Sequence, residues 1–481
     1  MRAFVLTLLV IAAIALPRAW AQALPDLGGT ADAALTPQTE RTIGETIMRE
    51  IRLRERAYLD DPEIADYLER LGVALLAGAP QARLDFEFFA MRDPSINAFA
   101  LPGGFIGVHT GLLLAAESES ELAAVLAHEM AHVTQRHIAR LFGAQQQQAI
   151  PAMVAIAAAI LLGRSRPDLA SGAAAAVQAG SIQSQLNYTR DFEREADRIG
   201  MQTLSDAGFD ARAMGAFFDK LQRQTRVADD GSVPSYLRTH PVTSERIADV
   251  EGRAATLKYR QRLDSLEFHL VRAKLRAESG DAQEAVTQHS SALRDRRYAI
   301  EAAARYALAS ALLRAGEPRR AAAELERLRA ANAASPMIES LAARVQRALG
   351  EREAALATLR EAMTRYPNRR FLAYDTANAL QEAGSNELAI ALITEQLRTH
   401  PRDARLHRLQ AQIYAALGKR LLQHQSQAEL YVLQGSLPAA IEQLQLARAA
   451  GDGDFYQLSA VEARLKALRT QHDEELREKR R

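Results

Sequence analysis

Hydrophobic positions recur with helical spacing near the start of the chain. The stretches "TPQTERTIGETIMREIRLR" and "DPEIADYLERLGVALLAG", between about residues 36 and 79, each read as a helix, and Gly78 and Pro80 end the second. Short apolar and aromatic runs follow, "LDFEFFAMRD" and "NAFALPGGFIGVHTG", which are typical of β-strands bounded by Pro and Gly. Ser118 and Glu121 then form an S-x-x-E capping box, so we expect a helix from there to about Arg140.

The next segment differs in composition. From Gln145 to about Gln185 it is rich in Gln, Ala and Gly, and residues 150–162 form an apolar run of 13 residues. A membrane span needs about 20 residues. For residues 150–162 a buried hairpin is therefore favoured, and an element that contacts a membrane is the alternative. A further helix is predicted at "DFEREADRIGMQTLSDAG", before Gly208, and "SYLRTHPVTSERIADVEGR" completes this half.

After about residue 260 the pattern changes to Ala-, Leu- and Arg-rich helix pairs. Turn glycines recur at intervals of 36, 34, 34 and 34 residues, and alanines follow four of them by five residues; the glycines are Gly280, Gly316, Gly350, Gly384 and Gly418. A 34-residue helix-turn-helix period resembles tetratricopeptide repeats. The alternative, an ordinary bundle with glycines at chance positions, is disfavoured by the regular spacing. A further helix pair is expected after Gly418, and then a fraying charged tail, "QHDEELREKRR".

Composition narrows the chemistry that the chain can perform. Its 481 residues suffice for two or three domains, and a net charge of +1 gives no global field that would attract nucleic acid. Hydrophobic residues make up 48% and charged residues 25%, the balance of a globular protein. Cysteine is absent from the sequence. Any metal ion must therefore be held by His, Glu and Asp side chains.

The N-terminus has the pattern of a secretory signal peptide. Arg2 supplies the positive charge, residues 4–16 the apolar stretch, and Ala19-Trp20-Ala21 the small-x-small cleavage site. We expect the mature chain to begin near Gln22 and to be exported to the periplasm. A single N-terminal membrane anchor is the alternative, and the short apolar stretch disfavours it.

The stretch "LAAVLAHEMAHVTQRHI" carries a candidate metal site. His128 and His132 lie four residues apart, so a helix presents both imidazoles on one face. Glu129 is rotated by about 100° and can reach a water on the metal without binding the metal itself. This is the H-E-x-x-H arrangement of zinc peptidases. His137 follows His128 by nine residues, not the ten of the longer histidine pattern, and we interpret it as an ordinary helix residue.

A catalytic zinc site needs a third protein ligand and one open position. Glu193 and Asp197, in "YTRDFEREADRIG", share one helix face, whereas Glu195 points to the opposite side. We predict that Glu193 binds the zinc and that Asp197 hydrogen-bonds a ligand histidine and fixes its tautomer. The alternative for Glu193 is a solvated helix glutamate. Zinc would make hydroxide available near neutral pH, with Glu129 as the general base in peptide hydrolysis.

Four segments together resemble the M48 family of zinc metallopeptidases, on its periplasmic branch with C-terminal tetratricopeptide repeats. They are "INAFALPGGFIGVHTGLL", "HEMAHVTQRHIAR", "YTRDFEREADRIG" and "RTHPVTSER". The resemblance implies a mostly α fold, with a zincin-like α+β metalloprotease domain that contains a small sheet, followed by an all-α repeat solenoid. The expected divisions are a signal peptide at 1–21, the metalloprotease domain at 22–258, the repeats at 259–470 and the tail at 471–481.

The same resemblance implies further roles. One Zn²⁺ would be held by His128, His132 and Glu193, and His240 would occupy the fourth metal position in a latent enzyme. The strand that contains Asn97, Ala98 and Phe99 would align an extended substrate by β-augmentation. Family members act at the outer membrane, where they support assembly of β-barrel proteins and degrade stalled ones. The expected partners are the barrel-assembly machinery, docked on the concave repeat face, and unfolded barrel proteins, with peripheral membrane contact and without nucleic acid.

Three functions are therefore compared. The leading hypothesis is a regulated zinc endopeptidase with chaperone-like activity. The alternative is mainly a repeat-based assembly chaperone or scaffold with a latent protease site. A third, a catalytically inactive scaffold, is disfavoured because all four residues of the predicted site, His128, Glu129, His132 and Glu193, are present.

Overall fold

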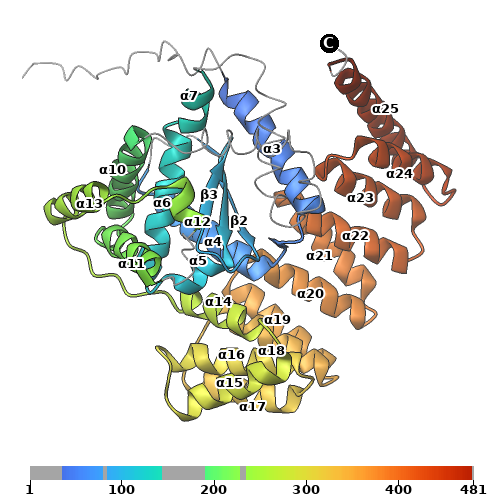
Figure 1. The fold of residues 1–481 in the computed structure, drawn as a ribbon. Helices are drawn as coiled ribbons and strands as arrows, with labels where there is room; N and C mark the ends of the chain where they lie inside the picture. Colours follow the sequence, from blue (N-terminus) through green and yellow to red (C-terminus); the bar gives the residue numbers. More distant parts are fainter. Residues whose placement is uncertain (1–34, 80–83, 144–189, 228–234, 479–481) are drawn as a thin grey trace, which may run out of the picture.

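The structure, a computed structural model, describes residues 35–79, 84–143, 190–227 and 235–478. The predicted signal peptide at 1–21 and the apolar run at 150–162 lie outside these residues. The described elements form an N-terminal part, from α3 to α13, and a repeat part, from α14 to α25 (Figure 1). Within the described ranges, no helix combines the length and the apolar character needed to cross a membrane.

The N-terminal part combines short strands with helices, as the change of hydrophobic period predicts. Its elements are α3 (Pro37–Arg54), β1 (Tyr58–Leu59), α4 (Pro62–Leu76), β2 (Glu87–Met91), β3 (Ala98–Leu101), β4 (Phe105–His109), α5 (Thr110–Ala115), α6 (Glu119–Thr134), α7 (His137–Gly143), α10 (Arg190–Asp206), α11 (Ala213–Val227), α12 (Ser235–Thr239) and α13 (Ser244–Thr256).

The four strands form one sheet in the order β1-β2-β4-β3, so β3 is an edge strand. β2 runs parallel to β4, and β3 runs antiparallel to β4 with Ala98 opposite Val108. The N–H of His109 donates to the carbonyl oxygen of Asn97. Because main-chain groups alternate along an antiparallel pair, those of Ala98 and Ala100 point to the other side of β3, where the described chain adds no strand.

α6 begins where the sequence predicts. The hydroxyl oxygen of Ser118 accepts the N–H of Glu121, as in a capping box. The predicted end near Arg140 is wrong, because α6 stops at Thr134. Arg136 adopts a φ of 53°, in the left-handed region that a helix cannot include. A separate helix, α7, therefore starts at His137.

The repeat part consists of consecutive helices with short connections, which confirms the predicted helical repeats. Its elements are α14 (Leu266–Ala277), α15 (Ala282–Arg294), α16 (Glu301–Arg314), α17 (Pro318–Ala330), α18 (Pro336–Ala348), α19 (Arg352–Arg365), α20 (Arg370–Glu382), α21 (Asn386–Thr399), α22 (Ala404–Ala416), α23 (Arg420–Leu433), α24 (Leu437–Ala449) and α25 (Phe455–Glu478).

The periodic glycines end the first helix of each pair. All five have φ between 61° and 81°, the left-handed conformation that terminates a helix without a Cβ clash. The further pair expected after Gly418 is present as α23 and α24. The predicted fraying tail at 471–481 is wrong as far as Glu478, because α25 continues to that residue.

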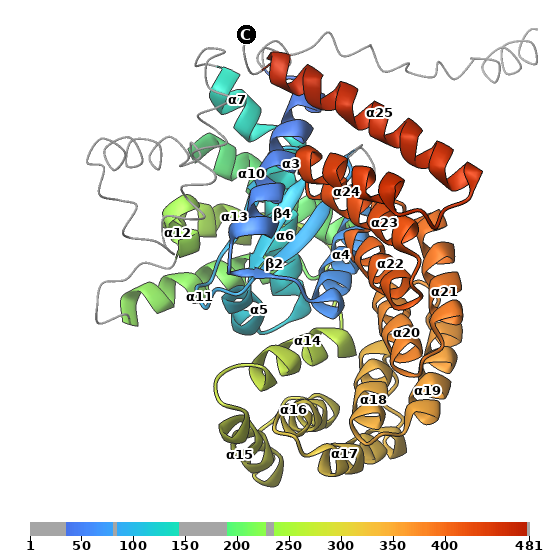
Figure 2. The same ribbon diagram turned by 90° about the vertical axis from the view of Figure 1, so that its right-hand side faces the viewer.

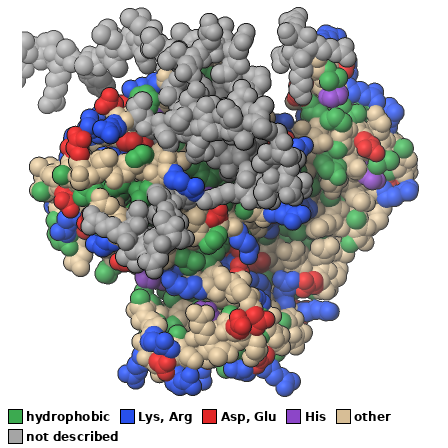
Figure 3. Space-filling model, viewed as in Figure 1, with side chains coloured by type: hydrophobic (Ala, Val, Ile, Leu, Met, Phe, Trp, Pro, Cys, Tyr) green, Lys and Arg blue, Asp and Glu red, His purple; other side chains and the backbone are tan. Residues whose placement is uncertain are grey.

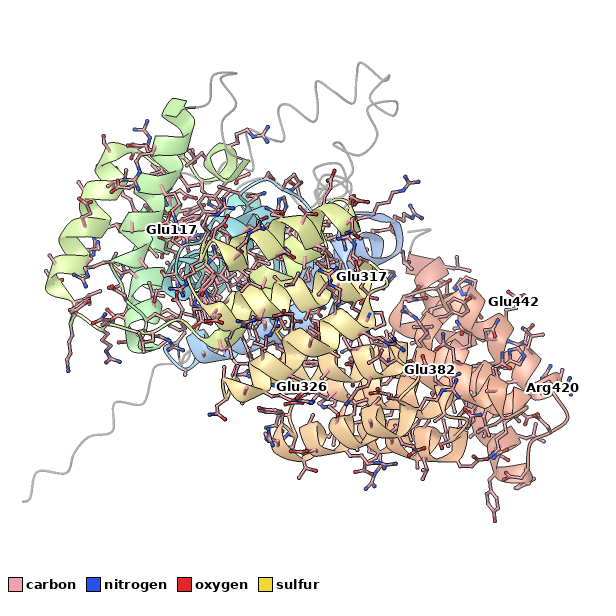
Figure 4. All side chains as sticks on the ribbon, turned by 90° about the horizontal axis from the view of Figure 1, so that it is seen from below. Glu117, Glu317, Glu326, Glu382, Arg420 and Glu442 are labelled. Atoms are coloured by element: carbon pink, nitrogen blue, oxygen red, sulfur yellow. The ribbon has the colours of Figure 1, made fainter. Side chains whose placement is uncertain are left out.

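Charged side chains of both signs lie on the surface of the repeat part. They are interspersed on the face shown in Figure 3, in agreement with the small net charge of the chain. Some of them link neighbouring repeats. Glu382 in α20, labelled in Figure 4, forms an ion pair with Arg347 in α18. Arg420, at the start of α23, donates to the carbonyl oxygen of Ala450 at 2.6 Å.

The repeat part curves around one helix of the N-terminal part. Figure 2 shows the repeat helices in an arc beside α4. At this contact the Lys274 Nζ lies 2.5 Å from Glu63 Oε2, and the Ser340 hydroxyl donates to Glu63 Oε1 at 2.7 Å. Arg369 pairs with Asp66 of α4. The expectation that the whole concave face is a docking surface is therefore corrected, because the N-terminal part already covers the portion that carries these residues.

Candidate metal centre

Four side chains that could bind a metal converge inside the N-terminal part. His128 and His132 come from α6, Glu193 from α10, and His240 directly follows α12. One ligand atom from each residue lies within 4.8 Å of the others. Each side chain is at most 2% exposed. The structure thus brings together groups separated by up to 112 residues of sequence.

Close packing of α6 on α10 places the carboxylate beside the two imidazoles. Gly200 of α10 lies against the α6 backbone, where an added Cβ would be 3.0 Å from the Ala127 carbonyl oxygen and from the His128 Cα. Such a contact is tighter than side chains normally tolerate. A residue with a Cβ at this point would push the two helices apart by a few tenths of an ångström, so glycine favours their close approach.

The spacing of the ligand atoms fits a small divalent cation. His128 Nε2 lies 3.0 Å from His132 Nε2 and 3.4 Å from His240 Nδ1, and Glu193 Oε1 lies 3.0 Å from His240 Nδ1. The Glu193 oxygens are 3.5 Å from the two Nε2 atoms. Tetrahedral coordination with bonds of about 2.0–2.1 Å separates ligand atoms by roughly 3.3 Å. Nitrogen and carboxylate atoms that face one another at these distances form a site for a cation.

Asp197 and Arg246 hold two of these ligands in place. Asp197 Oδ1 lies 3.0 Å from His128 Nδ1, on the side of the ring away from the cluster. Arg246 of α13 donates two hydrogen bonds of 2.7 Å to Asp197, and its Nη1 lies 2.8 Å from Glu193 Oε2. Burial favours a higher pKa for Asp197, but hydrogen bonds from His128 and Arg246 outweigh it and lower that pKa. Our sequence reasoning assigned no role to Arg246.

His137 lies in a helix and outside the ligand cluster, as predicted, but it also contacts one of the proposed ligands, which the sequence did not predict. His137 is fully buried, and its Nδ1 lies 2.8 Å from Nδ1 of His132. Glu195, which we expected to point to the opposite side, reaches His137 Nε2 at 3.3 Å. A continuous helix would separate residues 132 and 137 by about 140°. The break at Arg136 instead allows the two rings to meet, and the local sequence pattern does not show that break.

Glu129 is placed beside the cluster without belonging to it. Its side chain is fully buried, and its Oε1 lies 3.5 Å from His240 Nε2. Neither oxygen completes a hydrogen bond of normal geometry with a described residue, although the N–H of Ala100 lies near the carboxylate. Burial raises the pKa of Glu129 above its usual value. A carboxylate with a raised pKa is well suited to accept and return a proton.

The predicted substrate strand borders this site. Asn97 precedes β3, Ala98 begins it, and the outward N–H of Ala100 faces Glu129. The Asn97 Oδ1 is buried without a hydrogen-bond partner among the described residues. The Phe99 ring instead packs on the rings of Phe89 and His109, with centroid distances of 5.8 and 5.9 Å. The main chain of β3, more than the Phe99 ring, is therefore available at the site.

α12 covers the site from the other side. Tyr236 donates its N–H to the carbonyl oxygen of Ile96 at 3.2 Å, next to the start of β3. Its ring stacks on His240 with a centroid distance of 4.7 Å, and the N–H of His240 donates to the carbonyl oxygen of Tyr236. Sequence reasoning did not identify Tyr236. A single short helix thus contacts both the ligand cluster and the segment that leads into the edge strand.

Comparisons with known proteins agree with this geometry. The model of a family described as peptidase family M48 matches residues 59–254. Over 459 residues the chain is 32% identical to the β-barrel assembly-enhancing protease of Escherichia coli, which covers 93% of this chain and 92% of that protein. It is 43% identical over 252 residues to a putative β-barrel assembly-enhancing protease of Vibrio cholerae, covering 52% of this chain and only about half, 51%, of that relative.

A more distant similarity points to the same chemistry. The chain is 30% identical over 221 residues to a mitochondrial metalloendopeptidase of Arabidopsis thaliana, covering 46% of this chain and 42% of that protein. The similarity to the Escherichia coli protein extends over nearly the whole chain, and the buried ligand cluster fits a metal-dependent enzyme. The chain therefore belongs to peptidase family M48, the metalloendopeptidases, and is similar to its β-barrel assembly-enhancing members.

Proposed function

We propose that this protein is a periplasmic zinc endopeptidase with chaperone-like activity. In this proposal it supports assembly of outer-membrane β-barrel proteins and degrades misassembled ones. The relatives named β-barrel assembly-enhancing proteases support the substrate class and the location. The observation that carries the hydrolase function is the buried cluster of His128, His132, Glu193 and His240 with Glu129 beside it.

Zinc is the ion that we assign to the cluster. Histidine and carboxylate ligands in tetrahedral spacing, without thiolates, match catalytic zinc sites with two His and one Glu. His128, His132 and Glu193 would hold the ion, and Asp197 would fix the tautomer of His128 so that its Nε2 faces the metal. When bound, zinc supplies Lewis acidity toward water and toward a carbonyl oxygen.

Glu129 is the catalytic base in this proposal. Its carboxylate takes the proton of the attacking water and then delivers it to the leaving amine. The raised pKa supports both steps, because the carboxyl can hold the proton between them. Burial also excludes other water from the carboxylate, which protects the transferred proton from exchange.

The open side of β3 aligns the substrate. An extended peptide would pair with the outward main-chain groups of Ala98, next to Asn97 and Phe99, as a further strand. Hydrogen bonds between main chains do not depend on the side chains of the substrate. This mode of binding therefore suits an enzyme that acts on many different unfolded barrel strands. The N–H of Ala100 faces Glu129, so a peptide on this edge would pass close to the proposed base.

His240 and Tyr236 keep the enzyme latent in this proposal. His240 occupies the fourth ligand position, where a water molecule must bind before hydrolysis. Tyr236 bonds Ile96 beside the edge strand, so α12 also obstructs one end of the proposed substrate path. Displacement of α12 would release both sites together. The same geometry favours the alternative function, a repeat-based assembly chaperone whose protease site is used only occasionally.

The barrel-assembly machinery is the proposed docking partner of the repeats. The parts of the repeat surface that do not contact α4 remain available for it. The signal-like residues 1–21 support export to the periplasm, where such a partner is found at the outer membrane.

The experiment that tests this function compares wild type with Glu129→Gln. We expect the purified wild type to contain one zinc ion and to cleave unfolded β-casein. Glu129→Gln should retain the zinc and lose about 10²- to 10⁴-fold in activity, the usual contribution of a general base. Glu117→Gln, at an exposed position labelled in Figure 4, is the matched control.

Two outcomes decide between the functions. The proposed zinc endopeptidase function is wrong if the wild type holds no zinc, or if Glu129→Gln cleaves casein as fast as the wild type. If Glu129→Gln still supports barrel assembly in cells while degradation stops, the protein has both roles.

A further inference from the structure

A further histidine outside the ligand cluster, His137, contacts the proposed zinc ligand His132 on the side away from the metal. His137 Nδ1 lies 2.8 Å from His132 Nδ1, whereas His132 Nε2 faces His128 and Glu193. We propose that His137 is a positioning residue of the metal centre, which accepts a hydrogen bond from Nδ1–H of His132 and so fixes the tautomer and the ring orientation of that ligand. This inference rests on the proposed zinc site.

The proton positions follow from the contacts. A histidine that binds metal through Nε2 carries its proton on Nδ1 when neutral. The Nδ1 of His132 is therefore the donor, and the Nδ1 of His137 must be the acceptor. The proton of His137 then resides on Nε2, which lies 3.3 Å from the Glu195 Oε2. The three side chains thus form one directed series of hydrogen bonds.

Several contacts hold the His137 ring in this orientation. It stacks on Phe192 with a centroid distance of 4.5 Å and an interplanar angle of 9°. Arg140 Nη1 lies 2.8 Å from the same Glu195 oxygen that His137 reaches, and the Arg140 guanidinium lies over the Phe192 ring. The left-handed residue Arg136 starts α7 where His137 can reach back to His132. The ring is thus constrained by contacts beyond ordinary packing.

The two histidine ligands therefore have different orienting groups. His128 contacts the carboxylate of Asp197, which Arg246 also binds. His132 instead contacts the neutral imidazole of His137. The carboxylate of Glu195 contacts His137 and so acts on His132 only through that imidazole. Orienting partners of metal-bound histidines typically change metal affinity by 10- to 100-fold. His137 should accordingly contribute to zinc affinity although it does not bind zinc.

The test measures zinc affinity by competition with a chelator, and thermal unfolding of the zinc-free full chain. His137→Leu removes the acceptor, and we expect it to raise the zinc Kd by about 10- to 100-fold. His137→Asn places a carbonyl oxygen near the former Nδ1 and should restore most of the affinity. His289→Leu, a buried histidine of the repeat part, is the control and should leave the Kd unchanged.

A merely structural role gives a different result. In that case His137→Leu and His137→Asn would lower the melting temperature of the zinc-free protein alike, with zinc affinity unchanged, and the proposal would be overturned. If His137→Leu fails to fold, Glu195→Leu decides, because it removes the acceptor of the His137 proton at a partly exposed position. A weaker zinc affinity in this variant supports the proposal, and an unchanged one overturns it.

Failure of the proposed function is recognised separately. If wild type binds zinc and does not cleave casein, the endopeptidase function is wrong, whereas the role of His137 is still decided by the zinc affinities. The cobalt absorption spectrum gives an independent readout, because altered ligand orientation changes the coordination geometry around the metal. We expect His137→Leu to change this spectrum and His137→Asn to keep that of the wild type, and an unchanged spectrum in His137→Leu would contradict the proposal.

Discussion

At the scale of single residues, His240 makes two contacts that would oppose catalysis in the proposed mechanism. Its Nδ1 faces Glu193 and His128, and its Nε2 lies 3.5 Å from Glu129. One imidazole thus fills the fourth ligand position and contacts the proposed base. Removal of this ring should open the site while three metal ligands remain.

We therefore expect His240→Ala to raise casein cleavage. If the open form is about 10% populated in wild type, removal of the latch increases the rate roughly tenfold. Zinc content should be measured in parallel, because one ligand is lost. His472→Ala, on α25, is the control for loss of a histidine elsewhere. An unchanged or lower rate with full zinc content would argue against the latch.

The residues of the site differ in how far the sequence predicts them. His128, Glu129 and His132 follow from spacing within one helix, because three- and four-residue separations define a helix face. His137 and Arg246 do not. His137 depends on a helix break at Arg136, and Arg246 reaches Asp197 from a third helix, so neither contact has a local signature.

At the scale of elements, the edge strand β3 and the helix α6 carry the proposed substrate edge and the proposed catalytic base. Ala98 and Ala100 direct main-chain groups away from β4, and Ala100 faces α6 at Glu129. The order of strands in the sheet decides this property, because a central strand would have both sides paired. Short runs of apolar residues predict strands but do not specify their order.

Proline at position 98 tests the edge. Ala98→Pro removes one outward N–H at the first residue of β3, where a proline is tolerated and the bonds to β4 are kept. We expect the KM for an extended peptide to rise by roughly 3- to 10-fold, the value of one hydrogen bond, with little change in kcat. The control Ala98→Ser retains the N–H. Equal KM values in the two variants would exclude main-chain pairing at this residue.

At the scale of the whole molecule, buried charges join the repeats to the N-terminal part. Lys274 contacts Asp61 at 2.6 Å and Glu63 at 2.5 Å, and Arg344 lies 3.4 Å from Glu63. Burial favours a higher pKa for Glu63, but Lys274 and Arg344 outweigh it and hold that pKa below its usual value of 4.5. Glu63 is thus ionised at the contact over the normal pH range.

This pair predicts a pH-dependent stability. A carboxyl whose pKa is lowered by folding stabilises the protein above its unfolded pKa, and this stabilisation is lost as the pH falls below 4.5. Glu63→Gln should cost about 3 kcal/mol at pH 7, because it leaves part of the Lys274 charge without its partner. The difference in unfolding free energy from wild type, measured in urea, should decrease between pH 4.5 and pH 3. A constant difference over that range would contradict the pairing.

The sequence by itself determined the helix face that carries His128 and His132, with Glu129 beside it. It also determined the capped start of α6 and the 34-residue repeat. These features depend on separations of a few residues or on a regular period, which local backbone geometry converts directly into structure. The tertiary structure decided the rest. The approach of His240 to His128, the His137 contact, the open edge of β3 and the burial of α4 against the repeats involve packing between distant segments, and no local pattern encodes that packing.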